Sequence, residues 1–447
     1  MKLTAFILFA FCAAAAGAEI PAAGDAAAPG EQEELSAGAT SVFLADIAPL
    51  AAGAAGSPEA PGKTEKTVNA WLMGGRSFAP DSKSWTGSAS LLAATVFHPG
   101  ERWEFLPLYS GYYQLTSQSY ELAGGPVLVQ HRMDNRVSAK LIYNPPASRQ
   151  RWKLNAGDTV AFLKESKDER LGDGLFDYRI PTGGLEWEYF YRKGYAFRAG
   201  YDYYLVTFPN YLSLAGQGPN PNVLELRGTR VLDSRSHSVS AGINGPLERF
   251  DGMWDISYAL THKRYPEQPL VNSSGQLCGG RRLDYIHSIV FNSRAEGSFS
   301  WPPRVVGGLD ATGMWFDSNQ NHFDVYENRY ISDYYSYGEI RLAPYATAYL
   351  RGGGGTETPV RLSLSAEWSS RFYSHRPVQS ASGGYGAKRL RVQRLVLDTT
   401  LTWPLAKRVS ARGMYRLYVD SSNMEYKGFY SYNSTQHELS AGLGYEF

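Results

Sequence analysis

Apolar and polar residues alternate along most of this chain, and that period of two constrains the fold more than any other feature. Side chains of a β-strand point alternately to its two faces, so the alternation predicts strands with one apolar and one polar face. The pattern recurs over 185–191, 250–261, 360–372 and 409–420, and it is clearest at the C-terminus. There the apolar face is formed by Leu439, Ala441, Leu443, Tyr445 and Phe447.

The lengths of the segments and of their connections distinguish a membrane barrel from a soluble sandwich. Many segments run for roughly ten residues, which suits tilted strands that cross a bilayer better than soluble strands of about five or six. Short connections such as 192–194 and 403–408 alternate with long polar ones, predicted at His262–Gly280, Asp317–Arg329 and Tyr373–Lys388. Aromatic residues stand near the short turns, as an interfacial girdle requires: Trp103, Trp301, Trp403 and Phe447.

Strands in lipid must close into a barrel, because an unpaired backbone amide in hydrocarbon costs several kcal/mol. We therefore predict an all-β fold, a transmembrane antiparallel up-and-down β-barrel with short periplasmic turns and long extracellular loops, over residues 67–447. Counting alternating segments from Val68–Phe78 to His437–Phe447 gives about 16 strands, with 14 to 18 accepted because the faces near Val127–Tyr143 are mixed. An even number places both ends of the barrel on the periplasmic side.

The N-terminal residues predict export from the cytoplasm. Lys2, an apolar stretch and Ala16-Gly17-Ala18 are typical of a cleaved signal peptide over residues 1–18. Residues 19–66 are rich in Ala, Gly and Pro and predict a largely disordered periplasmic segment, with a short plug or docking helix as the alternative. The chain has no later run of 18 apolar residues, so no helical membrane span is expected. The predicted location is the cell outer membrane.

Composition excludes several classes of function. The 44 Lys+Arg residues balance 43 Asp+Glu, which argues against a nucleic-acid partner. Two cysteines, Cys12 and Cys278, cannot form a disulfide framework or a Cys-based zinc site. The loop Asp317–Asp324 has oxygens enough for Ca²⁺ but not the regular spacing, so an exposed polar loop is predicted there. We expect no metal and no cofactor.

No catalytic residue is predicted either. A Ser–His pair must lie within hydrogen-bond reach, and on a strand this requires residues two apart. Ser236-His237 and His287-Ser288 are adjacent, so their side chains point to opposite faces. The sequence therefore predicts a protein that is not an enzyme.

Charged residues recur on the polar faces of the predicted strands. An Arg facing lipid near the midplane would cost about 2–4 kcal/mol, so these residues are predicted to face the barrel interior. The predicted pore-lining residues are Arg198, Asp202, Asp255, Asp284, Arg294, Asp310, Arg341, Arg361, Glu367, Arg371, Arg394, Asp398, Arg412 and Arg416. Two interpretations stay open: a ladder of mutually neutralising charges, or charged walls that select solutes in a water-filled pore.

The last ten residues, Glu438 to Phe447, resemble the terminal signal strand of Gram-negative outer-membrane β-barrel proteins, with Phe last and apolar residues at alternate positions. The resemblance is porin-like over residues 67–447. The stretches Gly184–Phe208 and Tyr430–Phe447 are also similar to the C-terminal barrels of polysaccharide and surface-lipoprotein exporters. The resemblance implies recognition by the barrel assembly machinery after passage through the secretion translocase.

These observations together predict a porin-like channel for small hydrophilic solutes, with selectivity from the lumen charges. An export channel for a polysaccharide or protein is the first alternative, and a non-conducting structural or adhesive barrel is the second. The expected partners are outer-membrane lipid and lipopolysaccharide, the assembly machinery and small solutes, with no nucleic acid. The oligomeric state stays open, a homo-oligomer being one alternative.

Overall fold

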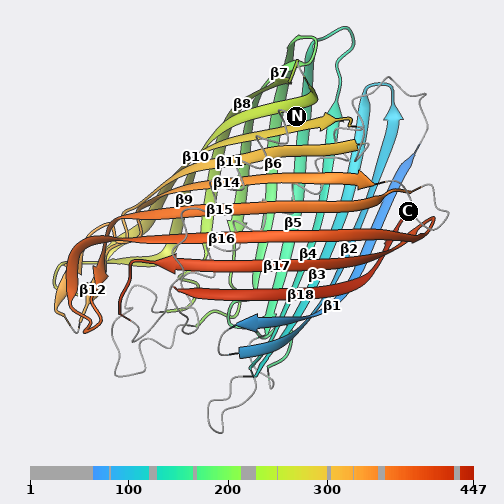
Figure 1. The fold of residues 1–447 in the computed structure, drawn as a ribbon. Coiled ribbons are helices and arrows are strands. Elements are labelled where there is room, and N and C mark those ends of the chain that lie inside the picture. The colour runs from blue at the N-terminus through green and yellow to red at the C-terminus, as the bar shows by residue number, and fades with distance from the viewer. Residues whose placement is uncertain are drawn as a thin grey trace.

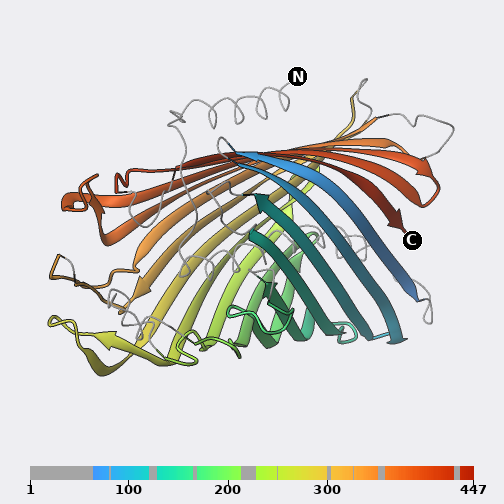
Figure 2. The same cartoon turned by 90° about the horizontal axis from the view of Figure 1, so that it is seen from below.

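The computed structural model describes residues 64–447 except 80–81, 120–127, 165–168, 213–227, 249, 300–303, 326, 351–357 and 427–432. Within that part of the chain, long strands wrap around one closed barrel (Figures 1 and 2). The strands are β1 (Glu65–Ala79), β2 (Ser82–Gly100), β3 (Trp103–Ser119), β4 (Leu128–Tyr143), β5 (Gln150–Lys164), β6 (Tyr178–Arg192), β7 (Tyr195–Val206), β8 (Ser234–Pro246), β9 (Asp251–Val271), β10 (Leu277–Gly297), β11 (Arg304–Ser318), β12 (His322–Asp324), β13 (Arg329–Ile331), β14 (Tyr337–Leu350), β15 (Val360–Gln379), β16 (Tyr385–Ala406), β17 (Val409–Ser422) and β18 (Ser434–Glu446).

Sixteen of these described strands form the barrel, and β12 and β13 pair separately as a small two-stranded sheet. Each barrel strand pairs antiparallel with the barrel strands that precede and follow it in the chain. The barrel closes where β1 pairs with β18, in a register that runs from Asn69 opposite Glu446 to Phe78 opposite His437. Closure pairs the backbone of the first and last strands, so the barrel leaves no open sheet edge. The predicted all-β, antiparallel, sixteen-stranded architecture is confirmed.

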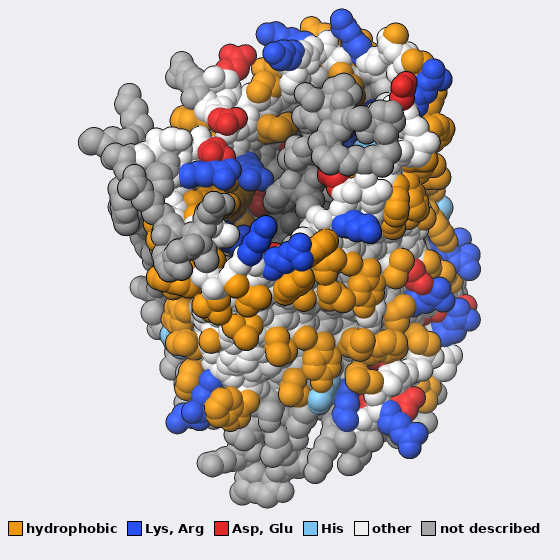
Figure 3. Space-filling view, turned by 90° about the vertical axis from the view of Figure 1, so that its right-hand side faces the viewer, with side chains coloured by type: hydrophobic (Ala, Val, Ile, Leu, Met, Phe, Trp, Pro, Cys, Tyr) orange, Lys and Arg blue, Asp and Glu red, His pale blue; other side chains and the backbone are white. Residues whose placement is uncertain are grey.

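The outer surface of the barrel is apolar around its middle. Leu72 on β1 is 67% exposed, Trp85 on β2 is 66% exposed and Leu439 on β18 is 59% exposed. Hydrophobic side chains gather in a band across the wall, and Lys and Arg side chains lie at its margins (Figure 3). The predicted girdle residues Trp103, Trp403 and Phe447 are also exposed, whereas Trp301 lies outside the described residues. A large, continuous apolar exterior of this kind fits hydrocarbon and not water.

Most connections at the end of the barrel that holds Glu65 and Phe447 are short turns, such as those between β2 and β3 and between β16 and β17. At the other end, the prediction of a long loop is wrong for two segments. Residues 262–280 mostly continue β9 and β10, and residues 373–388 mostly continue β15 and β16. Both hairpins extend past the membrane band, where their polar side chains no longer alternate with apolar ones. Polar composition therefore suggested a loop where the backbone is a paired strand.

The N-terminal predictions fall largely outside the described residues, which begin at 64. The signal peptide over 1–18 and the segment over 19–63 are therefore still predictions. β1 begins at Glu65, two residues before the predicted start of the barrel at Thr67. Among the described residues, none forms a helix of the length and apolarity that a membrane span requires.

Candidate functional site

The fourteen predicted pore-lining residues share one face of the barrel strands. On β17, for example, Tyr415 is 37% exposed on the apolar outer face, so Arg412 and Arg416 point the other way. On β16 the exposed Leu401 and Trp403 likewise place Arg394 and Asp398 on the opposite face. We call this opposite side the inward face. Whether these residues line a conducting pore stays a prediction.

Most ion pairs on the inward face bridge neighbouring strands. Arg394 lies directly opposite Asp420 and its Nε is 2.6 Å from the Asp420 Oδ1. Arg416 lies opposite Asp398, with 2.7 Å between Nε and Oδ2. Further pairs on this face are Arg341–Glu367 at 3.2 Å, Arg371–Glu339 at 2.8 Å, Arg361–Glu446 at 2.8 Å and Lys153–Glu186 at 2.7 Å.

Two of these interior pairs join strands that are not neighbours. Arg361 on β15 reaches Glu446 on β18, past β16 and β17. Arg198 on β7 forms an ion pair with Asp255 on β9, across Gly242 on β8. A Cβ at position 242 would lie 3.2 Å from an Arg198 Nη2 atom, so the glycine leaves the space through which the guanidinium passes. The absence of a side chain at Gly242 thus allows the Arg198 side chain to cross β8 and reach Asp255.

Three predicted residues make no ion pair within the described part of the chain: Asp202, Arg294 and Asp310. The Asp202 carboxylate lies over Gly184 on the neighbouring strand β6. Arg412 lies with its guanidinium carbon 5.0 Å from the centre of the Trp71 ring, a cation–π contact that bridges β17 and β1. The inward face therefore combines paired charges with a few of each sign that are not paired.

Sequence reasoning missed a basic column on β4. Val137 on this strand is 60% exposed, which places Arg132, Arg136 and Lys140 on the inward face, with Asp134 bonded to Arg132 at 2.7 Å. The signal was present as charges at every second residue. It was obscured because the outward face of β4 carries His131 and Asn135, whose side chains are hydrogen-bonded by Tyr113 and Tyr109 of β3.

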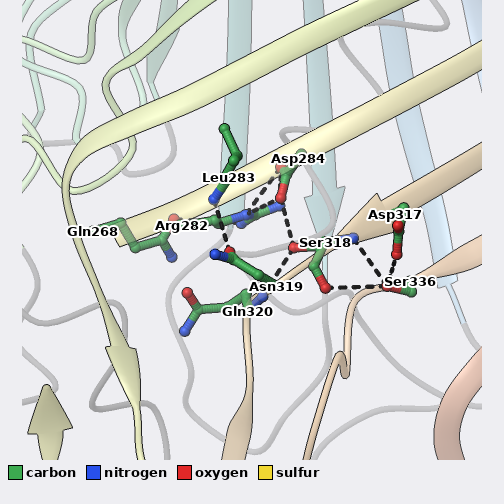
Figure 4. A network of polar contacts seen from close by, with 9 residues as sticks. All are labelled: Gln268, Arg282, Leu283, Asp284, Asp317, Ser318, Asn319, Gln320 and Ser336. Atoms are coloured by element: carbon green, nitrogen blue, oxygen red, sulfur yellow. Dashed lines mark hydrogen bonds and ion pairs between the residues drawn. The ribbon is translucent and has the colours of Figure 1, made fainter. Parts of the chain in front are cut away.

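At the end away from the short turns, a buried polar network holds the β11–β14 connection against β10 (Figure 4). Asp284 is fully buried; it pairs with Arg282 at 2.9 Å and accepts a hydrogen bond from the Ser318 hydroxyl at 2.6 Å. The Arg282 guanidinium also stacks 4.4 Å from the Tyr265 ring centre. Asp284 therefore contacts protein and not solvent, and the prediction that it lines a pore is wrong for this residue.

The same connection also reaches the second long hairpin. The backbone N–H of Ser374 on β15 donates to the Ser336 carbonyl at 2.9 Å, and the Tyr385 hydroxyl on β16 donates to Asp324 at 2.6 Å. Burial, together with that hydrogen bond, raises the pKa of the Tyr385 hydroxyl, so it stays a donor. Residues 319–336 thus join the β9–β10 and β15–β16 hairpins.

The segment Asp317–Asp324 is correspondingly not the exposed polar loop that its composition predicted. Ser318 is 2% exposed and Gln320 is fully buried. The Gln320 amide donates to the Pro269 carbonyl at 3.4 Å. Within the described residues, no three His, Cys, Asp or Glu side chains gather in a way that could hold a metal ion. The oxygens of this segment hold the connection in place.

An aromatic cluster covers the inward face beside this network. Phe316 and Tyr337 stack with ring centres 5.0 Å apart, and Tyr373 and Leu390 complete a buried group. The Arg371 guanidinium lies 4.3 Å from the Tyr337 ring centre while pairing with Glu339. The barrel interior at this end is therefore part aromatic and part charged.

Comparison with solved structures finds other barrels of the bacterial outer membrane. OccAB1 of Acinetobacter baumannii is 10% identical, with a TM-score of 0.45, over 87% of this chain and 99% of that one. OccD3 of Pseudomonas aeruginosa is 8% identical, with a TM-score of 0.40, over 88% and 94%. A bacterial polysaccharide outer membrane secretin is 12% identical, with a TM-score of 0.38, over 86% and 97%.

No protein-family model matches the sequence, and the search of curated proteins gives no match. The class follows instead from the barrel itself, because only a closed sheet with an apolar exterior satisfies both its backbone and a surrounding bilayer. Sixteen closed antiparallel strands, an apolar outer band and a charged inward face define a porin-like outer-membrane β-barrel.

Proposed function

We propose that this protein is a passive outer-membrane channel for small hydrophilic solutes and that the charges of its inward face set its selectivity. A sixteen-stranded barrel is wide enough to enclose an aqueous channel. The fourteen residues predicted from the sequence, apart from Asp284, and the basic column on β4 would form its lining.

The observation that carries the proposal is that the inward ion pairs are partly exposed. The side chains of Arg394 and Asp420 are 40% and 23% exposed, and those of Arg341 and Glu367 are 21% and 30% exposed. Charges in a dry interior would carry a desolvation penalty of several kcal/mol per ion. Partial exposure on the side away from the lipid supports an interior that water can enter.

Selectivity is expected to depend most on the inward charges without an ion pair, because a paired charge is largely cancelled at a distance by its partner. Arg136 on β4 is such a residue within the described part of the chain. Arg136→Glu replaces a positive charge with a negative one and should shift the reversal potential in a KCl gradient toward cation preference. Arg389→Glu, exposed on the outward face of β16, is the matched control and should leave the reversal potential unchanged.

The test is single-channel recording of the purified protein in planar bilayers. Ohmic conductance that increases with salt concentration, with the reversal potential moved by Arg136→Glu and not by Arg389→Glu, supports the proposal. A folded, inserted barrel that conducts no ions would overturn it and favour a structural or adhesive role.

The outward residues of β18 support a second proposal, on assembly. Leu439, Leu443, Tyr445 and Phe447 are all exposed on one face of the last strand, which pairs with β1 to close the barrel. We propose that the barrel assembly machinery binds this face before β18 pairs with β1. Deleting Phe447 should then lower the amount of barrel in the outer membrane while purified chain still refolds in detergent.

A further inference from the structure

The outward faces of β8 and β9 change in a regular order from apolar residues to histidines and then to arginines. Going from the short-turn end toward the long-hairpin end, the residues that lie directly opposite each other on the two strands are Ile243–Ile256, Ala241–Tyr258, Val239–Leu260, His237–His262 and Arg235–Arg264. The first three rows belong to the apolar band. The last two rows place two histidines and then two arginines at the margin of that band.

The two arginines face each other without a carboxylate between them. Arg235 and Arg264 are both exposed, and neither makes an ion pair within the described part of the chain. Cross-strand neighbours have Cβ atoms about 5 Å apart, and like charges at that separation destabilise a sheet. In the next row toward the short-turn end, the ring centres of His237 and His262 lie 6.4 Å apart. The two arginines therefore concentrate positive charge that an acidic residue at either position would cancel. These two arginines and two histidines are called here the Arg–His square.

Tyrosines on the flanking strands frame the Arg–His square. The Tyr201 hydroxyl on β7 hydrogen-bonds the His237 Nδ1 at 2.7 Å, and the Tyr203 ring centre lies 5.1 Å from that of His237. On the other side the Tyr285 ring centre on β10 lies 5.3 Å from that of His262. Exposed acids on these strands include Glu267, further along β9, and Asp317, opposite Tyr285 on β11.

We propose that the Arg–His square binds the phosphate group of a lipid in the outer leaflet, with the acyl chains of that lipid lying on the apolar rows below. Guanidinium groups bind phosphate through paired, charge-assisted hydrogen bonds, and two of them on adjacent strands can hold one dianionic phosphate. Phosphate charge between the arginines also offsets their mutual repulsion. Tyrosine at both sides suits the boundary between hydrocarbon and head groups.

The depth of the square matches that assignment. Arg235 lies at the start of β8, eleven residues from Pro246 at the short-turn end. A strand of about 9–11 residues spans the hydrocarbon of an outer membrane. The arginines therefore lie just outside the apolar band, where lipid phosphates lie. The inference requires the barrel to be in a membrane but does not depend on whether it conducts.

Lipid binding to the detergent-purified full chain tests the proposal. The probes are bis-phosphorylated lipid A, the same lipid with both phosphates removed, and inorganic phosphate, and the readout is the bound fraction by native mass spectrometry. The double variant Arg235→Gln/Arg264→Gln should bind bis-phosphorylated lipid A at least tenfold more weakly than the unaltered protein. The matched control Arg389→Gln/Arg391→Gln removes two exposed arginines from the outward face of β16 and should bind as the unaltered protein does.

A second variant separates binding from folding. Arg235→Glu places a carboxylate opposite Arg264, so the barrel should unfold at a higher temperature in lipid-free detergent while losing lipid binding. Equal binding of the dephosphorylated lipid, equal losses in the two double variants, or displacement of the lipid by inorganic phosphate at millimolar concentration would each overturn a lipid-phosphate site at the Arg–His square.

Discussion

At the scale of single residues, the inward face shows how polar alternation becomes a charged interior. An arginine that faces lipid near the midplane destabilises the barrel, so each arginine of these strands could be assigned to the inside from the sequence alone. Which acid each arginine would pair with could not be predicted, since pairing depends on the register between strands. The Arg198–Asp255 pair across Gly242 is an example, because its partners are 57 residues apart in the chain.

The buried pair Arg282–Asp284 gives a prediction at this scale. Asp284→Asn removes the only fully buried carboxylate of the network in Figure 4, which pairs with the Arg282 guanidinium, whose side chain is 9% exposed. Breaking a buried pair in this way costs about 3–5 kcal/mol. Arg329 is exposed but held in the paired strand β13. Loosening of residues 319–336 should let this segment enter the active site of trypsin, with cleavage after Arg329 at least tenfold faster than in the unaltered protein.

The exposed neighbour Asp317 provides the control for that experiment. Asp317→Asn removes the same charge from a solvent-facing position and should leave the cleavage rate within about twofold, because exposed polar changes rarely alter stability by more than about 0.5 kcal/mol. Unchanged cleavage in Asp284→Asn would show that the network does not hold the connection.

At the scale of elements, strands that cross the membrane could be predicted and their extensions could not. Lipid on one side and water on the other impose the period of two, which identified segments such as 409–420 and 437–447. Beyond the bilayer both faces of a hairpin meet water, so β9–β10 and β15–β16 lost the alternation and were predicted as loops. The network around Asp284 was invisible for the same reason, since no local pattern marks which polar side chains become buried.

Closure between β1 and β18 gives the prediction for this scale. A Cβ at position 444 would overlap the Trp71 ring, so Gly444→Val should block the pairing of the first and last strands. The folded fraction, measured as the band that migrates anomalously on unheated gels, should fall by more than half. Gly413→Val on β17, where an added Cβ meets no atom within 4 Å, should fold normally.

Adding Trp71→Ala to Gly444→Val tests the cause directly. Removing the indole opens the space that the valine needs, so the double variant should recover most of the folded fraction. Failure of that rescue would mean that Gly444 is required for its backbone and not for the close approach of Trp71.

At the scale of the whole molecule, the account rests on the contrast between the two sides of the barrel wall. The outward side offers Val239 and Ala241 to hydrocarbon, and the inward side holds Ser240 between them on the same strand. The fold class, the closure and the strand number could be predicted from the sequence because consecutive residues of each strand alternate between the two sides of the wall. The function does not follow so directly, because solute passage depends on the width of the interior.

Spin labels on β8 test the contrast most directly. Single cysteines at Val239, Ser240 and Ala241, in a background with Cys12 and Cys278 replaced by serine, would carry nitroxides in protein reconstituted into liposomes. Labels at 239 and 241 should be relaxed by membrane-soluble oxygen and shielded from a water-soluble nickel chelate, and the label at 240 should show the reverse. Equal chelate access at all three positions, or oxygen access greatest at 240, would contradict a barrel with lipid outside and water inside.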